Sequence, residues 1–142
     1  MFISVFNQGT NSSSKLENPT PETIKELMAA FKGNVAGFHI SGEEGYLTVL
    51  RGEDDRVKVV YNDMQDSSQP DYNWGILSDP TLMGDAREIE VDYGTETTPE
   101  PIYRTIPSER ALEIALYFLE HEAPPKGLTW DGRMDRFQWI AS

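Results

Sequence analysis

The sequence predicts an α+β fold, in which an antiparallel meander sheet carries two amphipathic helices packed on one of its faces. An apolar period of 3.6 residues occurs twice, over residues 20–33 and 107–123, and a period of two governs much of the chain between them. The intervening segments follow one another through short polar turns, which favours antiparallel pairing over crossover connections. We therefore expect a single domain spanning residues 1–142.

The first helix has clear start and stop signals. Residues 2–6 are predicted to form a short strand, followed by a polar loop over residues 7–14. Thr20 then fits the N-cap and Pro21 the first helical position, where its missing N–H is harmless. We expect Gly33 to close the helix in the left-handed conformation. The apolar stripe between these signals consists of Ile24, Leu27, Met28 and Phe31.

The middle of the chain reads as a series of strands. The expected strands cover residues 38–40, 46–50, 57–61, 72–77 and 88–93. The last one alternates most regularly. Its apolar residues, Ile89, Val91 and Tyr93, are expected to face the core, and its three carboxylates to face water. Residues 95–101 are predicted to be a linker to the second helix.

The second helix is the strongest pattern in the chain. Pro107 and Ser108 mark its start, one as a first-turn proline and the other as an N-cap. Pro124 and Pro125 forbid its continuation. A candidate edge strand follows at residues 128–131. The broad apolar face of the helix consists of Ala111, Leu112, Ile114, Ala115, Leu116, Phe118 and Leu119.

The charge of the chain is strongly negative and unevenly distributed. The 142 residues hold 24 acidic and 12 basic side chains, a net charge of −12. Residues 43–100 alone hold 15 acidic and 4 basic residues. This balance disfavours direct contact with nucleic acid or an anionic membrane, and a basic protein partner is its natural complement. The alternative is that the excess acid only keeps the protein soluble.

The sequence indicates neither a targeting segment nor a cofactor site. Residues 1–6 lack the basic start and the apolar length of a signal peptide, and no apolar run approaches 18 residues, so we expect a cytoplasmic protein. The absence of cysteine excludes disulfides, thiolate nucleophiles and cysteine-based zinc sites. Two histidines alone argue against a transition-metal site. We expect no cofactor and no metal, and the oligomeric state is left open.

Catalysis has little support in the sequence. His39 falls in a predicted strand and His121 at a helix end, where a cation complements the helix dipole, so a structural role is the simpler interpretation of each. No phosphate-binding loop, metalloprotease motif or nucleophile elbow occurs. A hydrolase using two of the many carboxylates remains a third alternative. We expect no catalytic residues and predict that the protein is not an enzyme.

Two acidic loops are the candidate partner-binding residues. Tyr and Trp beside carboxylates are typical anchors of protein interfaces. Both a core position and an exposed one fit Trp74, whereas Trp130 and Trp139 are expected to lie partly in the core. We predict that the two loops form one contact surface, comprising Glu53, Asp54, Asp55, Asp63, Asp66, Asp71, Tyr72 and Trp74.

The second helix and the segment after it resemble immunity protein family one, the inhibitors encoded beside bacterial polymorphic toxins. The resemblance lies in Ile106-Pro107, Ala111-Leu112, Ala115-Leu116, Phe118-Leu119, Pro125 and Leu128-Thr129-Trp130. Weaker agreement extends upstream to residue 40, through residues 46–49, 57–61, 78–80 and 84–85. One departure is that residues 120–123 stand where members of the family often carry glycine after the helix.

The resemblance implies a cytoplasmic α+β inhibitor whose partner is a cognate toxin domain, commonly a nucleic-acid deaminase. Such a toxin needs a basic substrate channel, so an acidic inhibitor could occupy that channel as a phosphate mimic. The alternative is an acidic adaptor or chaperone-like binding module that has no toxin partner.

Overall fold

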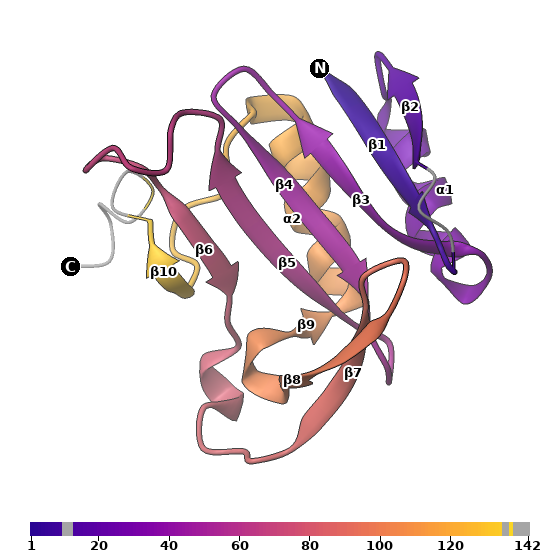
Figure 1. Cartoon of the computed structure of the whole chain (residues 1–142), viewed down its shortest axis with the longest axis vertical. Coiled ribbons are helices and arrows are strands. Elements are labelled where there is room, and N and C mark those ends of the chain that lie inside the picture. The colour runs from indigo at the N-terminus through magenta and orange to yellow at the C-terminus, as the bar shows by residue number, and fades with distance from the viewer. Residues whose placement is uncertain (10–12, 135–136, 138–142) are drawn as a thin grey trace.

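One antiparallel sheet organises the molecule (Figure 1). The structure, a computed structural model, describes residues 1–9, 13–134 and 137. The meander of four consecutive strands predicted from the sequence is confirmed, from β3 to β6. Across the sheet the strands are β10 (Trp130–Arg133), β6 (Trp74–Leu77), β5 (Arg56–Asp63), β4 (Gly45–Arg51), β3 (Val35–Ser41), β1 (Phe2–Asn7) and β2 (Ser13–Glu17), with β9 (Ile106–Pro107) paired to β5.

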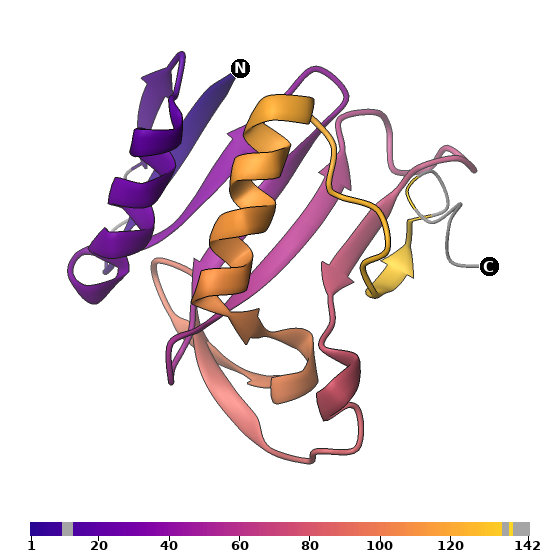
Figure 2. The ribbon, with the colours of Figure 1, turned by 180° about the vertical axis from the view of Figure 1, so that it is seen from behind.

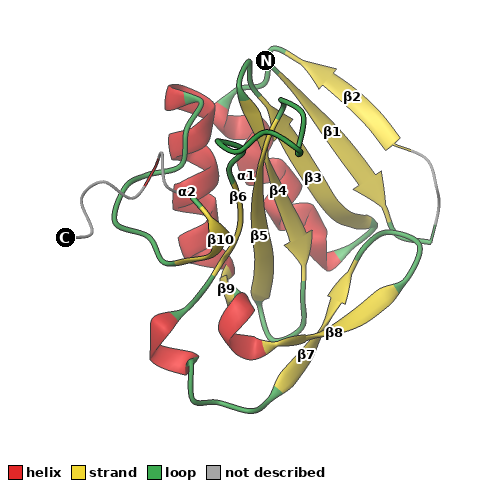
Figure 3. Ribbon diagram, turned by 60° about the vertical axis from the view of Figure 1, so that its left-hand side comes forward, coloured by secondary structure: helices red, strands yellow, loops and turns green. Residues whose placement is uncertain are grey.

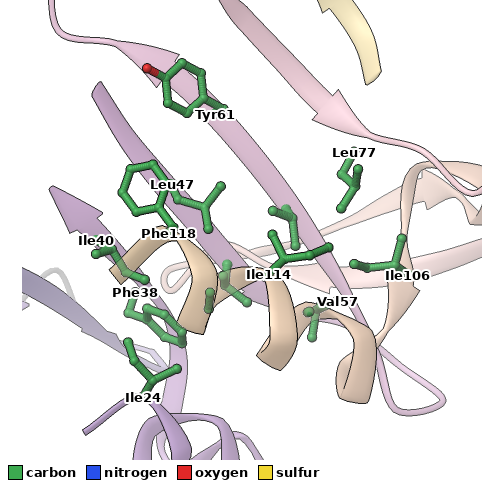
Figure 4. Close-up of a cluster of buried hydrophobic side chains, with 14 of the residues drawn as sticks. Ile24, Phe38, Ile40, Leu47, Val57, Tyr61, Leu77, Ile106, Ile114 and Phe118 are labelled. Atoms are coloured by element: carbon green, nitrogen blue, oxygen red, sulfur yellow. The ribbon is translucent and has the colours of Figure 1, made fainter. Parts of the chain in front are cut away.

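Two helices, α1 (Pro21–Ala29) and α2 (Ser108–His121), cover one face of this sheet, as the sequence predicts (Figure 2). Side chains from the strands alternate between the covered face and the opposite face, which we call the open face. Figure 4 shows the core formed where α2 meets the strands, with Ile114 and Phe118 lying against Leu47, Val57 and Tyr61. Burial of these apolar side chains is the main force that holds the helices on the sheet.

The start of α1 confirms the predicted cap, but its end differs. The Thr20 hydroxyl accepts a hydrogen bond from the Thr23 amide, and the Thr23 hydroxyl accepts one from the Thr20 amide. After Ala29 the chain continues as a 3₁₀ turn, Ala30–Lys32, and Gly33 has φ −123° rather than a left-handed value. Arg51 takes over the role of a glycine cap. Its guanidinium donates hydrogen bonds to the carbonyls of Phe31 and Gly33 at the end of this turn.

The start of α2 lies one residue earlier than a cap at Ser108 would place it. Pro107 occupies the N-cap position without a side-chain bond, and Ser108 is the first helical residue. The Ser108 amide and hydroxyl both donate to the Asp55 carbonyl, which joins the helix start to the β4–β5 turn. At the other end Glu122 adopts φ 55°, the left-handed conformation that glycine favours. The backbone conformation of Glu122 is thus the one that glycine would provide.

A separate two-stranded hairpin lies across one end of the open face (Figures 1 and 3). It consists of β7 (Glu88–Asp92) and β8 (Thr97–Pro101), so part of the expected linker is a strand. Ile89 and Val91 are buried as predicted, whereas Asp92 is buried and Tyr93 is exposed, the reverse of the expectation. Asp92 faces inwards because it bonds Arg51, and Tyr93 is placed by Lys58.

Three further strands differ slightly from the bounds predicted from the sequence. β2 falls partly within the expected loop of residues 7–14, β6 begins at Trp74 rather than residue 72, and β10 runs to Arg133. Two further 3₁₀ turns, Pro80–Leu82 and Ile102–Arg104, connect the sheet to the hairpin and to β9. No helix among the described residues has the length and apolar character needed to cross a membrane. Trp139 lies outside the described residues.

Candidate functional site

The two acidic loops predicted to form one surface lie at opposite ends of the sheet. Glu53, Asp54 and Asp55 form the β4–β5 turn at the start of β5, and the loop from Met64 to Asn73 follows its end. β5 has eight residues, which separate the two loops by about 23 Å along the strand. Because adjacent antiparallel strands turn at alternate ends of a sheet, the two loops form two separate patches rather than one continuous surface.

The first patch, which we call the loop end, gathers three segments far apart in the sequence. The Glu43 amide donates to the Glu122 carboxylate over 3.1 Å, which fixes the β3–β4 turn to the end of α2. The Met64 amide donates to the Glu44 carbonyl over 2.8 Å, which joins the same turn to the β5–β6 loop. The exposed carboxylates brought together at the loop end are Glu43, Glu44, Asp66, Asp71 and Glu122.

Asp63 does not belong to this exposed patch, in contrast to the prediction. Its side chain is 3% exposed and accepts hydrogen bonds from Tyr61 and from both the amide and side chain of Asn73. A carboxylate in this position closes the base of the β5–β6 loop, since it bonds residues at both ends of the loop. Asp63 is thus a structural residue that orders the loop rather than a contact residue.

Two large apolar side chains stand exposed among the carboxylates of the loop end. Trp74 is 42% exposed and Met64 is 47% exposed, so the structure places Trp74 at the surface rather than in the core. Tyr72 is half-buried, and its hydroxyl lies 3.2 Å from the Asn62 side-chain oxygen on the open face. Trp74 pairs directly with Asn62, so both side chains belong to the open face. The loop end is therefore continuous with that face.

The second patch, the hairpin end, consists of Glu53, Asp54 and Asp55 together with Glu88 and Glu90 of β7. The Glu53 carboxylate accepts from the Glu90 amide over 2.6 Å, and the Glu53 amide donates to the Glu90 carbonyl. Asp54 and Asp55 both have φ 57°, as in a type I′ turn. Apart from these bonds the patch is made of charged side chains in water. None of these five residues has an apolar side chain.

All four basic residues of the acidic middle segment have carboxylate partners within that segment. Arg51 pairs with Asp92, Arg56 with Asp79, Lys58 with Glu100 and Arg87 with Asp85. The first three pairs are largely buried and hold the hairpin and the 3₁₀ turns on the sheet. The exposed carboxylates at the two ends therefore have few local cations to neutralise them, and each end presents a net negative field.

The open face contains a groove that the sequence did not indicate. It has a volume of about 320 Å³ and lies between the sheet and the hairpin. His39 stands at its centre, with the Phe6 ring 4.5 Å away and the Tyr46 ring 5.3 Å away, both edge-on. The alternation of aromatic residues with core residues in β1, β3 and β4 could have signalled it. The lining residues are Phe6, His39, Tyr46, Thr48, Leu50, Val60, Asn62 and Tyr93.

His39 is a neutral, hydrogen-bonded residue in this groove. Its Nδ1 lies 2.6 Å from the Thr48 hydroxyl. Burial among the surrounding rings lowers the pKa of His39 to about 4, so that the imidazole carries no charge at neutral pH. His121 lies at the end of α2, exposed and stacked on Tyr117 with ring centroids 4.2 Å apart. The imidazole of His39 bonds a hydroxyl rather than a carboxylate, and the Glu120 carboxylate beside His121, 3.7 Å from its Nε2, is exposed to solvent.

Among the described residues, no group of three or more His, Asp or Glu side chains could hold a metal ion. Comparison with known protein families, characterised proteins and solved structures finds no match to this chain. The resemblance of residues 40–131 to the immunity family therefore stays a prediction from the sequence.

Proposed function

We propose that this protein is an immunity protein, which binds and neutralises a cognate toxin domain in the cytoplasm of the cell that makes the toxin. The toxin class is one that acts on nucleic acid, with deamination as the chemistry that the family resemblance implies. The proposal rests on one observation: exposed carboxylates and exposed Trp74 and Met64 lie side by side at the loop end. The role is binding, which requires no cofactor and no catalytic residue.

The chemistry of this patch suits a basic enzyme surface. A nucleic-acid-modifying domain carries lysine and arginine where the phosphate backbone passes, and carboxylates can occupy those positions in place of phosphates. Opposite charge also accelerates encounter, towards about 10⁸–10⁹ M⁻¹s⁻¹ at low salt. Trp74 and Met64 would provide the desolvated anchor that holds the complex once formed, since aromatic and methionine side chains are enriched in interface cores.

The loop end is a better candidate than the hairpin end. Both patches are acidic, but at the loop end Trp74 and Met64 stand exposed among the carboxylates, and this end continues into the open face. Of the eight residues predicted to bind the partner, the proposal keeps Asp66, Asp71, Tyr72 and Trp74. Asp63 is replaced by Glu43, Glu44 and Glu122, which the fold brings to the same end.

The test is co-expression with the product of the gene directly upstream, where an immunity function requires a toxin domain, scored by cell survival and by a co-purifying complex. Two variants with equal loss of charge locate the surface. One carries Glu43→Gln, Glu44→Gln, Asp66→Asn and Asp71→Asn at the loop end, and the other carries Asp54→Asn, Asp55→Asn, Glu88→Gln and Glu90→Gln at the hairpin end. We expect the first to lower the association rate at least tenfold and the second to change it less than threefold.

Each other outcome has a definite meaning. If survival does not depend on this chain and no complex forms, the immunity function is wrong, and an acidic adaptor becomes the better interpretation. Equal effects of the two variants would show that net charge matters and the loop end does not. Hydrolase activity with a bell-shaped pH–rate profile would instead support the carboxylate-enzyme alternative.

A further inference from the structure

We propose that the groove on the open face binds one cationic side chain, an arginine or a lysine, presented by a basic loop of the partner protein. The inference deepens the proposed function and rests on it for the identity of the partner. It assigns a specific role to a groove that lies beside the loop end but shares none of its exposed carboxylates.

The shape of the groove suits a single long side chain. Its volume of about 320 Å³ is open to solvent on one side, and its inner surface is formed by Thr48 and Leu50, which are buried. Ring side chains supply the walls, with His39 and Tyr46 on the sheet and Tyr93 at the end of β7. The methylene groups of lysine or arginine would pack on these walls while the charged head lies against the aromatic rings.

The charges around the groove favour a cation. Lys58 donates to Glu100 over 2.8 Å and to the Tyr93 hydroxyl over 2.7 Å, so its charge is compensated beside the groove. Burial alone would lower the pKa of Lys58, but the hydrogen bonds to Glu100 and Tyr93 raise it above its ordinary value, which keeps this internal ion pair formed. His39 is neutral at pH 7. Lys58 already lies over the Tyr93 ring, with its Nζ 5.4 Å from the ring centroid, so an incoming cation would meet the rings of Phe6 and Tyr46 and no uncompensated positive charge among the lining residues.

The groove also opens towards the acidic loop end. Tyr46 lines it and follows Glu43 and Glu44 by two or three residues, and Asn62 lines it while accepting from Tyr72 of the β5–β6 loop. A basic loop drawn to the carboxylates of the loop end would thus carry its next side chain along the open face into the groove. Charge complementarity favours a cationic occupant over an apolar one, because the exposed carboxylates of Glu43 and Glu44 lie only two or three residues from the lining residue Tyr46.

The experiment uses the full chain and a small probe, the peptide Ac-Gly-Arg-Gly-NH₂. Its matched control replaces arginine by citrulline, which has nearly the same shape without the charge. Titration followed by ¹H–¹⁵N NMR should shift the amide signals of His39, Thr48 and Asn62 with the arginine peptide, and the citrulline peptide should bind at least fivefold more weakly. Equal shifts with both peptides, or shifts confined to the loops, would overturn the proposal.

Two variants distinguish binding of the peptide in the groove from its nonspecific attraction to an acidic protein. Val60 and Ile76 face each other on neighbouring strands of the open face, but only Val60 lines the groove. Val60→Lys should abolish the groove shifts by placing a cation there, whereas Ile76→Lys, which adds the same charge, should retain them. Should Val60→Lys fail to give a dispersed spectrum, Tyr46→Leu removes one aromatic wall without a charge and should weaken arginine binding at least threefold.

Co-expression with the toxin distinguishes failure of this inference from failure of the proposed function. A toxin captured and inhibited equally by Val60→Lys and Ile76→Lys would leave the immunity function standing and remove the groove from it. Arginine binding in the groove without any toxin capture would keep the groove and contradict the immunity function. Loss of toxin binding in Val60→Lys alone is the result expected if both hold.

Discussion

His39 illustrates how a single residue can make the stability of this protein depend on pH. Its pKa is about 4 in the folded chain, because burial disfavours the imidazolium, and about 6.5 when the chain is unfolded. Between these values the unfolded state binds more protons than the folded state, so the free energy of unfolding falls as pH falls from 6.5 to 4. We expect His39→Gln, which retains a group able to bond Thr48, to lose this part of the pH dependence.

The measurement is urea unfolding of both proteins at several pH values across this window. The difference between wild type and His39→Gln isolates the histidine, because buried carboxylates such as Glu100 contribute to both proteins. A difference that is constant with pH would contradict the neutral, buried state of His39.

Residue-level roles could be predicted where the cause is local. The Thr20 cap and the first-turn Pro21 depend only on neighbouring residues, and both are confirmed. The buried, structural role of Asp63 could not be predicted from the sequence, since it depends on a hydrogen bond from Asn73, at the far end of the β5–β6 loop. The prediction of a left-handed cap at Gly33 was wrong, because Arg51, from another element, donates to the carbonyls at the end of the helix.

At the scale of elements, the β4–β5 turn is predicted to be strained. Asp54 and Asp55 both occupy the left-handed region, where a side chain costs roughly 1 kcal/mol or more and Asn-Gly is favoured. We expect Asp54→Asn with Asp55→Gly to raise the free energy of unfolding by about 1 kcal/mol. The bond from Ser108 to the Asp55 carbonyl is retained, because it uses the backbone.

Thermal unfolding followed by circular dichroism measures this effect, and Asp54→Asn with Asp55→Asn, which removes the same two charges, serves as the control for lost charge. A double variant less stable than wild type would mean that the carboxylates of the turn stabilise the fold. The same variant should leave toxin binding unchanged if the loop end is the contact surface.

Shortening side chains on different faces of helix α2 should lower the stability of the fold by different amounts. Ile114 is 1% exposed and lies in the core, so Ile114→Ala should cost about 2–5 kcal/mol. Leu116 packs against the core but is only partly buried, so Leu116→Ala should cost less than half of that. Chemical denaturation of the two variants gives the comparison. Equal losses would contradict the orientation of the helix on the sheet.

The elements that the sequence did predict are those with a strong period. The meander from β3 to β6 and both helices carry apolar residues at the spacing of one buried face. β2 and β8 lack this signal, because their residues are polar or proline-containing and they lie at an edge or in the hairpin. Their pairing is set by the partner strand, and a partner cannot be read from the local pattern.

For the molecule as a whole, a net charge of −12 should make stability depend on salt. Exposed carboxylates at both ends repel one another, and raising the salt from about 0.01 M to 0.15 M shortens the screening length from about 30 Å to 8 Å. The buried pairs Lys58–Glu100 and Arg51–Asp92 are screened less. We therefore expect the melting temperature to rise with NaCl over this range.

Calorimetry in NaCl, repeated with the four-charge loop-end variant, checks this expectation. The variant should have a higher melting temperature at low salt and a smaller rise with salt. A melting temperature that falls with NaCl would mean that exposed ion pairs outweigh the repulsion.

The candidate site was only partly predictable at this scale. Charge and aromatic content pointed to Asp66, Asp71 and Trp74, but sequence distance hid that Glu43 and Glu122 join them. The same reasoning merged the hairpin end with the loop end, although the predicted strand at residues 57–61 lies between the two loops and an antiparallel meander turns at opposite ends of each strand. The groove depends on four strands and the hairpin together, so no single segment could reveal it.

The pairing of Arg51, Arg56, Lys58 and Arg87 with carboxylates divides the acidic residues into two functional pools. The carboxylates that pair with the arginines and the lysine hold the hairpin and the 3₁₀ turns on the sheet, whereas the exposed acids at the turns make fewer structural bonds, among them those of Glu53 to the Glu90 amide and of Glu122 to the Glu43 amide. Exposed turn positions outside these bonds could therefore be substituted to change which partner is recognised, while the framework that presents them is retained.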